Sequence, residues 1–357
     1  MKKILGIILA VMMLTMTGCG GTNDTGTKKI GVLIPKTNSD RWIRDGETFK
    51  EEFEKRGYEV EVLNAQDDVE TQIEQIKEMI SKDVDVMIIG AVDTLALEDV
   101  LIGAEEKKIP VISFDKLIMN SNAISYFVAF DSEFVGRTYG EYIEKEFGLK
   151  DGKGGYNVEF FAGSIDDSNA KLIHESLLKV LQPYIDNEQL KVPSGQTKFN
   201  NTDTYRWLKQ ESYRRMNEFM TNIYNDGTEL DAVICASDCV ADGVISSLIA
   251  KNYGNGESWP VITGQDANIS AYKYIMADKQ ALTMLKDTHL LAPKCIEIVD
   301  ALMQGKTPDT KDATIYNNGN VDVPSYLYTP VVITKDNVKE VLLDSGFYTA
   351  EQVGDKE

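Results

Sequence analysis

A set of polar and aromatic side chains follows the buried strands that the sequence predicts. Arg41 and Trp42 come after the first apolar run, residues 29–35, and Asp115 and Lys116 come after the run "PVISF". Later members of the set are Asn169, Trp207, Asp238, Gln265, Asp266 and Lys286. Ligand-binding groups of a parallel sheet lie beyond the carboxyl ends of its strands. The positions therefore predict one shared binding site.

The side-chain types suit a neutral, polyhydroxylated ligand such as a monosaccharide. A sugar hydroxyl both donates and accepts hydrogen bonds, so carboxylate or amide oxygens serve it on one side and Arg, Lys or amide N–H groups on the other. The C–H face of a sugar ring packs on a flat aromatic group, which an indole provides. We expect Arg41 to bind hydroxyls while its neighbour Trp42 covers a ring face.

Phosphate binding, catalysis and purely structural roles fit these residues less well. The segment after the first strand has neither a P-loop nor the G-x-G-x-x-G spacing of a dinucleotide site. A carbohydrate-active enzyme is an alternative, with Asp115 and Asp238 as acid and base. Taken singly, Asp115, Asp238 or Asp266 is better explained by a helix N-cap, Trp207 by the core and Lys286 by solvation. The occurrence of all of them at strand ends is what favours a shared site. No calcium-loop motif occurs in the sequence, and we expect neither metal nor cofactor.

Composition predicts a soluble globular chain of two domains. Its 357 residues are too many for one small core, and 43% are hydrophobic. A formal net charge of −20 repels phosphate backbones, which makes nucleic acid an unsuitable partner. Cys235, Cys239 and Cys295 do not amount to a disulfide framework, and we expect small buried thiols.

The secondary-structure pattern alternates strand and helix from Lys29 and restarts near residue 124. A helix is predicted over 43–56, and an amphipathic one follows with Asp67 or Asp68 as its N-cap. Further predictions are a helix over 205–224 and a final strand over 326–334. Two successive series of this kind predict the α/β class with two doubly wound parallel sheets.

The first residues have the pattern of an export signal. Lys2 and Lys3 precede an apolar stretch of about 13 residues, too short for a membrane span. The next segment, "MTGCGG", resembles a bacterial lipobox, with Met16 in place of the usual leucine. That resemblance implies a signal peptide over 1–18, a lipid on Cys19 and a flexible tether over 19–28, which would anchor the protein outside the membrane. An ordinary secretory signal with an incidental cysteine is the alternative.

Long segments of the chain resemble a known family. They include "RWIRDG", "KKIPVISFDKLI", "GGYNVEFFAGSIDDSNAK", "ITGQDANI" and "LTMLKDT". They resemble the extracytoplasmic sugar-binding proteins of ABC importers, with the type I periplasmic-binding-protein fold, and among these the xylose-binding and multiple-monosaccharide-binding members. The resemblance implies a non-catalytic protein, a monomer by default.

The same resemblance implies roles for the whole set of site residues. Arg41 and Trp42 match an Arg-Trp pair that binds and stacks on the sugar, and Trp207 matches a second stacking indole. Matching sugar-binding positions are Asp115, Asn169, Asp238, Gln265, Asp266 and Lys286. Lys116 stands where the family has Arg, and a lysine ammonium cannot make the two parallel hydrogen bonds of a guanidinium. Ser237 stands where the family has Asn.

Two lobes joined by a three-strand hinge are expected to close on the sugar. Their expected limits are 29–130 plus 268–315 for lobe one and 131–267 plus 316–347 for lobe two, with 348–357 as a C-terminal tail. The hinge crossings are expected near Asp131, Asp266 and Asn320. The closed form would deliver a monosaccharide to an ABC permease.

A sugar sensor that presents its ligand to a chemoreceptor or receptor kinase is the main alternative function. A DNA-binding repressor shares the fold, but it would need an N-terminal helix-turn-helix and a basic surface, and this chain has a signal-like segment and acidic charge.

Overall fold

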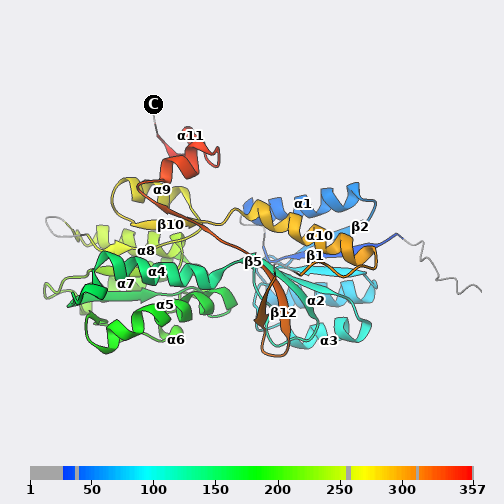
Figure 1. The fold of residues 1–357 in the computed structure, drawn as a ribbon, viewed down its shortest axis with the longest axis horizontal. Coiled ribbons are helices and arrows are strands. Elements are labelled where there is room, and N and C mark those ends of the chain that lie inside the picture. The colour runs from blue at the N-terminus through cyan, green and yellow to red at the C-terminus, as the bar shows by residue number, and fades with distance from the viewer. Residues whose placement is uncertain (1–26, 37–39, 255–258, 311–312, 356–357) are drawn as a thin grey trace, which may run out of the picture.

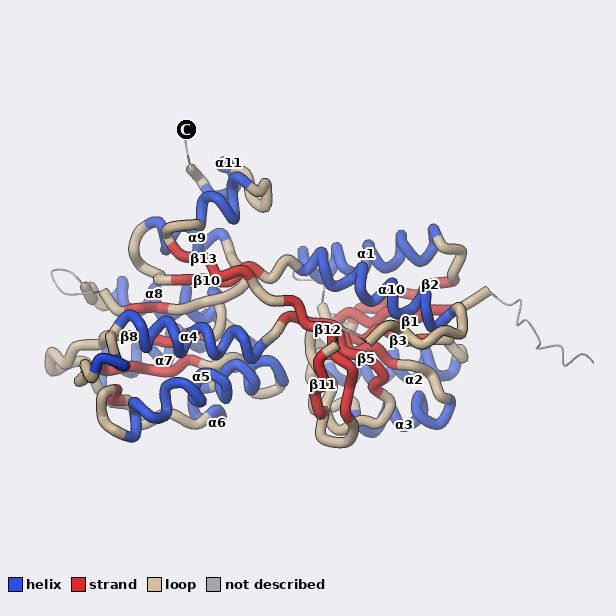
Figure 2. Tube along the Cα trace, viewed as in Figure 1, coloured by secondary structure: helices blue, strands red, loops and turns tan. Residues whose placement is uncertain are grey.

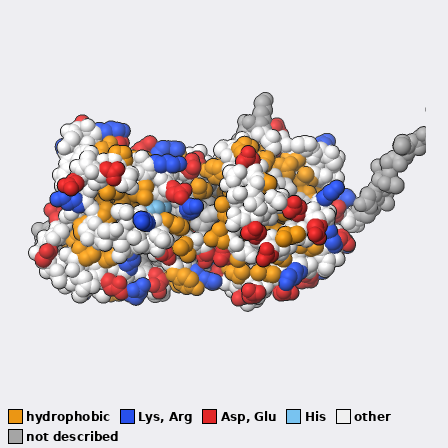
Figure 3. Space-filling view, turned by 90° about the horizontal axis from the view of Figure 1, so that it is seen from below, with side chains coloured by type: hydrophobic (Ala, Val, Ile, Leu, Met, Phe, Trp, Pro, Cys, Tyr) orange, Lys and Arg blue, Asp and Glu red, His pale blue; other side chains and the backbone are white. Residues whose placement is uncertain are grey.

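The computed structural model describes residues 27–36, 40–254, 259–310 and 313–355. They form two α/β lobes side by side, each with helices on both faces of a sheet (Figure 1). On the face seen in Figure 3, acidic and basic side chains are interspersed over both lobes. The predicted fold class, two sheet-based lobes with parallel strands, is confirmed.

Lobe one is built on a seven-stranded sheet in the order β11-β12-β5-β4-β3-β1-β2. All its neighbouring strands run parallel except the edge pair β11–β12. The strands are β1 Lys29–Ile34, β2 Glu59–Asn64, β3 Val86–Ile89, β4 Val111–Phe114, β5 Ile124–Phe130, β11 Thr314–Asn317 and β12 Asp322–Tyr328. Every residue of β3 and β4 is buried, as expected for parallel strands covered on both faces.

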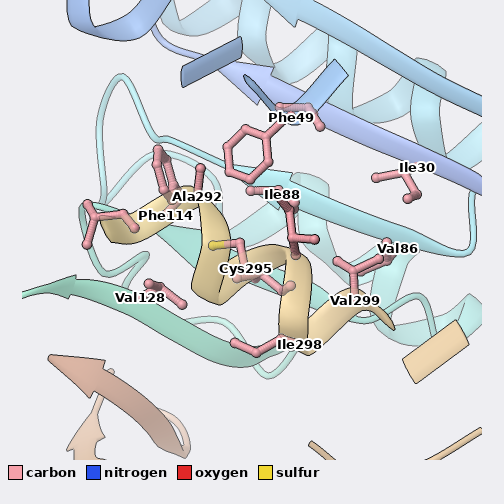
Figure 4. Packing of buried hydrophobic residues seen from close by; sticks show 14 of the residues in the cluster. Ile30, Phe49, Val86, Ile88, Phe114, Val128, Ala292, Cys295, Ile298 and Val299 are labelled. Carbon is pink, nitrogen blue, oxygen red and sulfur yellow. The ribbon is translucent and has the colours of Figure 1, made fainter. Parts of the chain in front are cut away.

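Four helices cover this sheet. They are α1 Asp40–Lys55, α2 Val69–Ser81, α3 Glu98–Lys107 and α10 Leu291–Met303. One face packs under α1 and α10, where Cys295, Ile298 and Val299 of α10 meet Ile88 and Phe114 (Figure 4). The other face packs under α2 and α3. The N-cap of α2 is Asp68, whose carboxylate accepts from the backbone N–H of Thr71.

Lobe two is built on a four-stranded parallel sheet in the order β7-β6-β8-β9, beside a two-stranded antiparallel pair, β10–β13. The strands are β6 Tyr156–Phe161, β7 Leu190–Lys191, β8 Ala232–Cys235, β9 Val261–Ile262, β10 Leu282–Leu285 and β13 Val331–Thr334. The helices are α4 Ser132–Glu146, α5 Ser168–Asp186, α6 Phe199–Thr202, α7 Lys209–Asn222, α8 Asp238–Ala250, α9 Ile269–Met276 and α11 Ala350–Val353. One core cluster joins the sheet to α4 and α5, and another joins it to α7 and α8.

Two of the three connections between the lobes differ from the expected ones. The chain crosses between β5 and α4, between β10 and α10, and between β12 and β13 (Figure 2). The first lies at Asp131, whose N–H donates to the carbonyl of Tyr328 over 2.9 Å. The crossings expected near Asp266 and Asn320 are wrong, because the chain crosses instead within 286–287 and 329–330.

The expected limits of the lobes change accordingly. Residues 268–285 belong to lobe two, because β10 pairs with β13 and Leu282 and Met284 lie in the lobe-two core. Residues 316–328 belong to lobe one, because β12 pairs with β5. The expected tail also contains α11, whose Val353 is buried against Tyr272 and Ile275.

Two local predictions are also corrected. The helix expected from residue 205 begins at Lys209, because Arg206 and Trp207 have φ angles of 48° and 61°, which no right-handed helix accepts. The single strand expected over 326–334 is two strands, since the chain passes from one lobe to the other at Thr329 and Pro330.

Helices α4 and α5 approach so closely that their contact requires a glycine. A Cβ added at Gly136 would lie 2.0 Å from the carbonyl oxygen of Ile173 and 2.3 Å from Oγ of Ser176. We expect Gly136→Ala to lower the free energy of unfolding by about 1–3 kcal/mol through overpacking, measured by urea denaturation.

The matched control is Gly103→Ala in α3, where a Cβ would make only ordinary contacts with Ile80 at 3.4–3.5 Å. That change should raise stability by about 0.5–1 kcal/mol, because alanine favours the helix. Equal effects at the two positions would contradict the assigned α4–α5 contact.

Candidate functional site

The loops beyond the carboxyl ends of β4 and β6 come from different lobes and contact each other directly. Nδ2 of Asn169, after β6, donates to the carbonyl of Asp115, after β4, over 2.8 Å. Oγ of Ser168 donates to the carbonyl of Leu117 over 3.0 Å. Members of the predicted set from both lobes thus lie together, as the strand-end rule requires.

The loop after β3 adds to the same inter-lobe contact. The N–H of Thr94 donates to the carbonyl of Asp166 over 3.1 Å, and the N–H of Ser168 donates to Oγ1 of Thr94 over 3.2 Å. Thr94 was not predicted, because no pattern in its own segment marks it.

The carboxylate of Asp167 joins three parts of the site. As N-cap of α5 it accepts from the backbone N–H of Asn169 over 2.9 Å. Its Oδ2 lies 3.0 Å from Nζ of Lys116, in the other lobe, and accepts from Nε1 of Trp207 over 3.3 Å. Burial alone would lower the pKa of Lys116, but the charge and hydrogen bond of Asp167 outweigh it and raise that pKa, so the ammonium stays charged.

Both predicted indoles lie against a glycine just past the carboxyl end of a strand. Trp42, in α1, is 4% exposed, with its ring edge-on to Phe114 at a centroid distance of 5.9 Å. A Cβ at Gly90, after β3, would lie 2.9 Å from this indole. Trp207 is half-buried, and a Cβ at Gly163, after β6, would lie 2.1 Å from it. Both indoles thus lie at the strand ends, where the sequence predicts the site.

The side chain of Arg41 lies outside the described residues. Its backbone belongs to the first turn of α1, directly before Trp42.

Several predicted residues have strained backbone. The φ angles of Asp115, Trp207 and Asp266 are 68°, 61° and 94°, in the left-handed region that residues other than glycine enter at a cost. Such strain gathers at functional sites, where the surrounding structure holds it.

The helix-cap explanation of the three aspartates is wrong. Helix α8 is capped by Ser237, whose Oγ accepts from the N–H of Val240, and α9 follows Asn268. Asp115 follows β4 and does not precede a helix in the described chain. Ser237, the departure from the expected Asn, therefore has a structural role as a cap.

Asp238 is a buried carboxyl group held by neutral partners of lobe two. It accepts from the N–H of Asn268 over 2.8 Å, from Nε2 of Gln280 over 2.8 Å and from Oγ1 of Thr283 over 2.8 and 2.9 Å. A Cβ at Gly264 would lie 2.2 Å from its Oδ1, so only glycine fits there. Burial, and secondarily the charge of Asp266, raise the pKa of Asp238 to about 8.

Gln265 and Asp266 lie beside Asp238, whose N–H donates to the carbonyl of Gln265 over 2.9 Å, and Lys286 pairs with Asp266 at the second crossing. Nε2 of Gln265 donates to the carbonyl of Ala236 over 2.7 Å, and its buried Oε1 has no hydrogen-bond partner among the described residues. Nζ of Lys286 lies 3.1 Å from Oδ1 of Asp266. Together with Asp238 these side chains supply a carboxylate, an amide oxygen and an ammonium, which suit hydroxyl groups.

The cysteines are free in the described structure. Cys235 and Cys295 are buried, as expected, and burial raises the pKa of both thiols. The expectation of a buried thiol is wrong for Cys239, which lies exposed in the first turn of α8.

Comparison with known proteins gives consistent matches. Residues 30–307 match the family model described as a periplasmic binding protein domain. The chain is 40% identical over 331 residues to the multiple sugar-binding periplasmic receptor ChvE of Rhizobium radiobacter, covering 92% of this chain and 93% of that protein. It is 33% identical over 325 residues to the D-xylose-binding periplasmic protein of Escherichia coli, covering 91% and 92%.

A solved structure has the same sequence identity to this chain as the receptor from Rhizobium radiobacter. It is an ABC transporter solute-binding protein from Clostridium phytofermentans with bound β-D-glucose. Its TM-score is 0.84 and its sequence identity 40%, with 91% of this chain and all of that chain covered.

The raised pKa of Asp238 predicts a pH-dependent stability. The folded protein keeps this proton up to about pH 8, whereas the unfolded chain loses it near its ordinary pKa of about 3.9. The folded state therefore binds more protons between these values, and stability falls as the pH rises, by at most about 1.4 kcal/mol per unit from this group.

Asp238→Asn cannot ionise, so its stability should fall less steeply between pH 5 and pH 8 than that of the wild type. Urea denaturation at four pH values measures both slopes. Identical slopes would show that Asp238 does not hold the proton.

Proposed function

The chain belongs to the periplasmic binding protein domain family, and from that premise we propose that it binds a monosaccharide between its two lobes for an ABC sugar importer. The observation that carries this proposal is the meeting of the strand-end loops of both lobes at Asp115, Lys116, Asp167 and Asn169. A ligand placed there contacts both lobes at once. Binding therefore favours the arrangement in which the lobes meet.

Both lobes contribute residues to the proposed site. Lobe one supplies Arg41, Trp42, Asp115 and Lys116, and lobe two supplies Asn169, Trp207, Asp238, Gln265 and Asp266, with Lys286 at the second crossing. The carboxylates and amides bind hydroxyl groups, and the indoles cover the apolar ring faces.

The expected affinity is compatible with a small ligand. A Kd of about 1 μM is about −8 kcal/mol. Over roughly ten heavy atoms of a pentose this stays below the ceiling of about 1.5 kcal/mol per atom.

The names of the similar proteins support the ligand class. One is a solved ABC transporter solute-binding protein with bound β-D-glucose, and another is a D-xylose-binding protein. We assign an aldopentose or aldohexose, such as xylose, glucose, galactose or arabinose, as ligand and the importer's membrane permease as partner. Binding without catalysis is the activity proposed.

A sensing role is the second candidate. The protein from Rhizobium radiobacter is named a receptor for multiple sugars. We propose that this chain can also present its bound sugar to a chemoreceptor or sensor kinase, with the same site and the same closure.

Calorimetric titration tests the binding function. The full chain, kept in a detergent without a sugar head group, is titrated with xylose, glucose, galactose, arabinose, ribose and fructose. We expect at least one aldose to bind with a Kd of about 1 μM or below. Trp207→Ala should weaken that binding at least about tenfold, because it removes the stacking surface.

The matched control is Trp259→Ala. Trp259 lies before the amino end of β9, where its Nε1 donates to the carbonyl of Lys279, so its loss should leave the Kd unchanged. No binding to any sugar of the panel contradicts the proposed function. Equal losses from the two substitutions remove Trp207 from the site.

We also propose that the protein is held outside the cell membrane by a lipid on Cys19, which lies outside the described residues. No helix in the described part of the chain has the length and apolarity to cross a bilayer. The proposal rests on the lipobox-like segment and the extracytoplasmic family.

Cys19→Ser tests this anchor. The variant should leave the membrane fraction for the soluble extracytoplasmic fraction and lose incorporation of labelled fatty acid, since a thioether-linked lipid needs the sulfur. Unchanged membrane association and labelling would contradict the anchor.

A further inference from the structure

An ion pair joins the two lobes outside the residues assigned to the sugar. Nη1 of Arg206, in lobe two, donates to Oδ2 of Asp67, in lobe one, over 2.9 Å and to the carbonyl oxygen of the same residue over 2.8 Å. Asp67 lies in the loop between β2 and α2, beside the cap residue Asp68. Neither partner belongs to the predicted sugar-binding set.

The backbone on both sides of this pair is strained. Asp67 has a φ angle of 65° and Arg206 one of 48°, so each side chain is presented from a tight turn. The turn of Arg206 is fixed within lobe two as well, because its N–H donates to Oγ of Ser164 over 2.8 Å. Strain of this kind persists only where surrounding contacts hold it.

The turn that carries Arg206 also carries Trp207. The indole of Trp207 donates to Asp167, which in turn holds Lys116 of lobe one. Trp207 is therefore flanked by two bridges between the lobes, one through Asp67 and one through Lys116. Because Arg206 and Trp207 are adjacent in one turn, the ion pair that holds Arg206 against lobe one also holds Trp207 in place relative to that lobe.

We propose that Asp67 and Arg206 form a latch, a positioning pair that stabilises the closed arrangement and holds the Trp207 turn without touching the sugar. The proposal rests on the proposed sugar-binding function for its effect on affinity. Because its partners lie in different lobes, the latch contributes only when the lobes meet. It should therefore strengthen the binding of every monosaccharide by the same factor.

The exposure of the two side chains sets how much the latch can change the affinity for the sugar. The side chains of Arg206 and Asp67 are 33% and 34% exposed, so solvent and salt screen their attraction. Partly exposed ion pairs of this kind change an equilibrium constant by about two- to fivefold.

Four variants test the latch in the full chain. Arg206→Gln, Asp67→Asn and the double variant are compared with Arg214→Gln, which removes the same charge from lobe two. Arg214 pairs only with Glu211 and Glu218 of its own helix among the described residues, so its loss cannot affect closure.

The first readout is the Kd for D-glucose and for D-xylose. Arg206→Gln should weaken both by about two- to fivefold, and by the same factor, while Arg214→Gln changes neither. The double variant should be no weaker than Arg206→Gln, because both changes break one pair. The loss should shrink in 1 M NaCl. A changed glucose-to-xylose ratio would place Arg206 on the sugar and overturn the proposal, as would an unchanged Kd.

The second readout needs no sugar. The amides of Thr94 and Ser168 donate across the lobes, so their hydrogen exchange reports closure. Arg206→Gln should speed exchange in peptides that contain these amides, with β4 and β6 unchanged; unaltered exchange would overturn the latch. If the wild type binds no monosaccharide, the proposed function fails, and this exchange measurement still decides whether the latch exists.

Discussion

The arrangement of the site depends on the contacts that the carboxylate of Asp167 makes. It caps α5, holds the indole of Trp207 and pairs with Lys116 of the opposite lobe. One buried carboxylate thus contacts the first turn of α5, the indole of Trp207 and a lysine of lobe one. Its removal would leave the partly buried ammonium of Lys116 without this counter-charge, which is costly. The site is therefore a property of the two lobes together.

The parallel sheets explain why these groups can meet at all. In both lobes the functional loops follow the carboxyl ends of strands, so β4 and β6 deliver Asp115 and Asn169 to one place. Close packing at these ends excludes a Cβ at Gly90 and Gly163, which lets the two indoles lie directly against the backbone. Three short crossings connect the lobes, and the proposed closure requires them to act as a hinge.

Much of this arrangement could be predicted from the sequence, because it depends on local patterns. Buried apolar runs predict β3 and β4, and the strand-end rule predicts that Asp115 and Asn169 lie together. The limits of the lobes could not be predicted, because β12 belongs to lobe one only through its pairing with β5. The turn at Arg206 and Trp207 cannot be predicted from the sequence either. Its left-handed backbone carries no glycine or asparagine signal, and the hydrogen bond from the N–H of Arg206 to Ser164 joins residues far apart in the sequence.

A crystal structure of the protein with D-glucose tests the central claim most directly. The account predicts the sugar between the lobes, with a ring face on Trp207 and hydroxyls on Asp115 and Asn169, and with the Asp67–Arg206 pair intact outside the sugar. A sugar bound elsewhere on either lobe, or one that contacts a single lobe, would contradict the account.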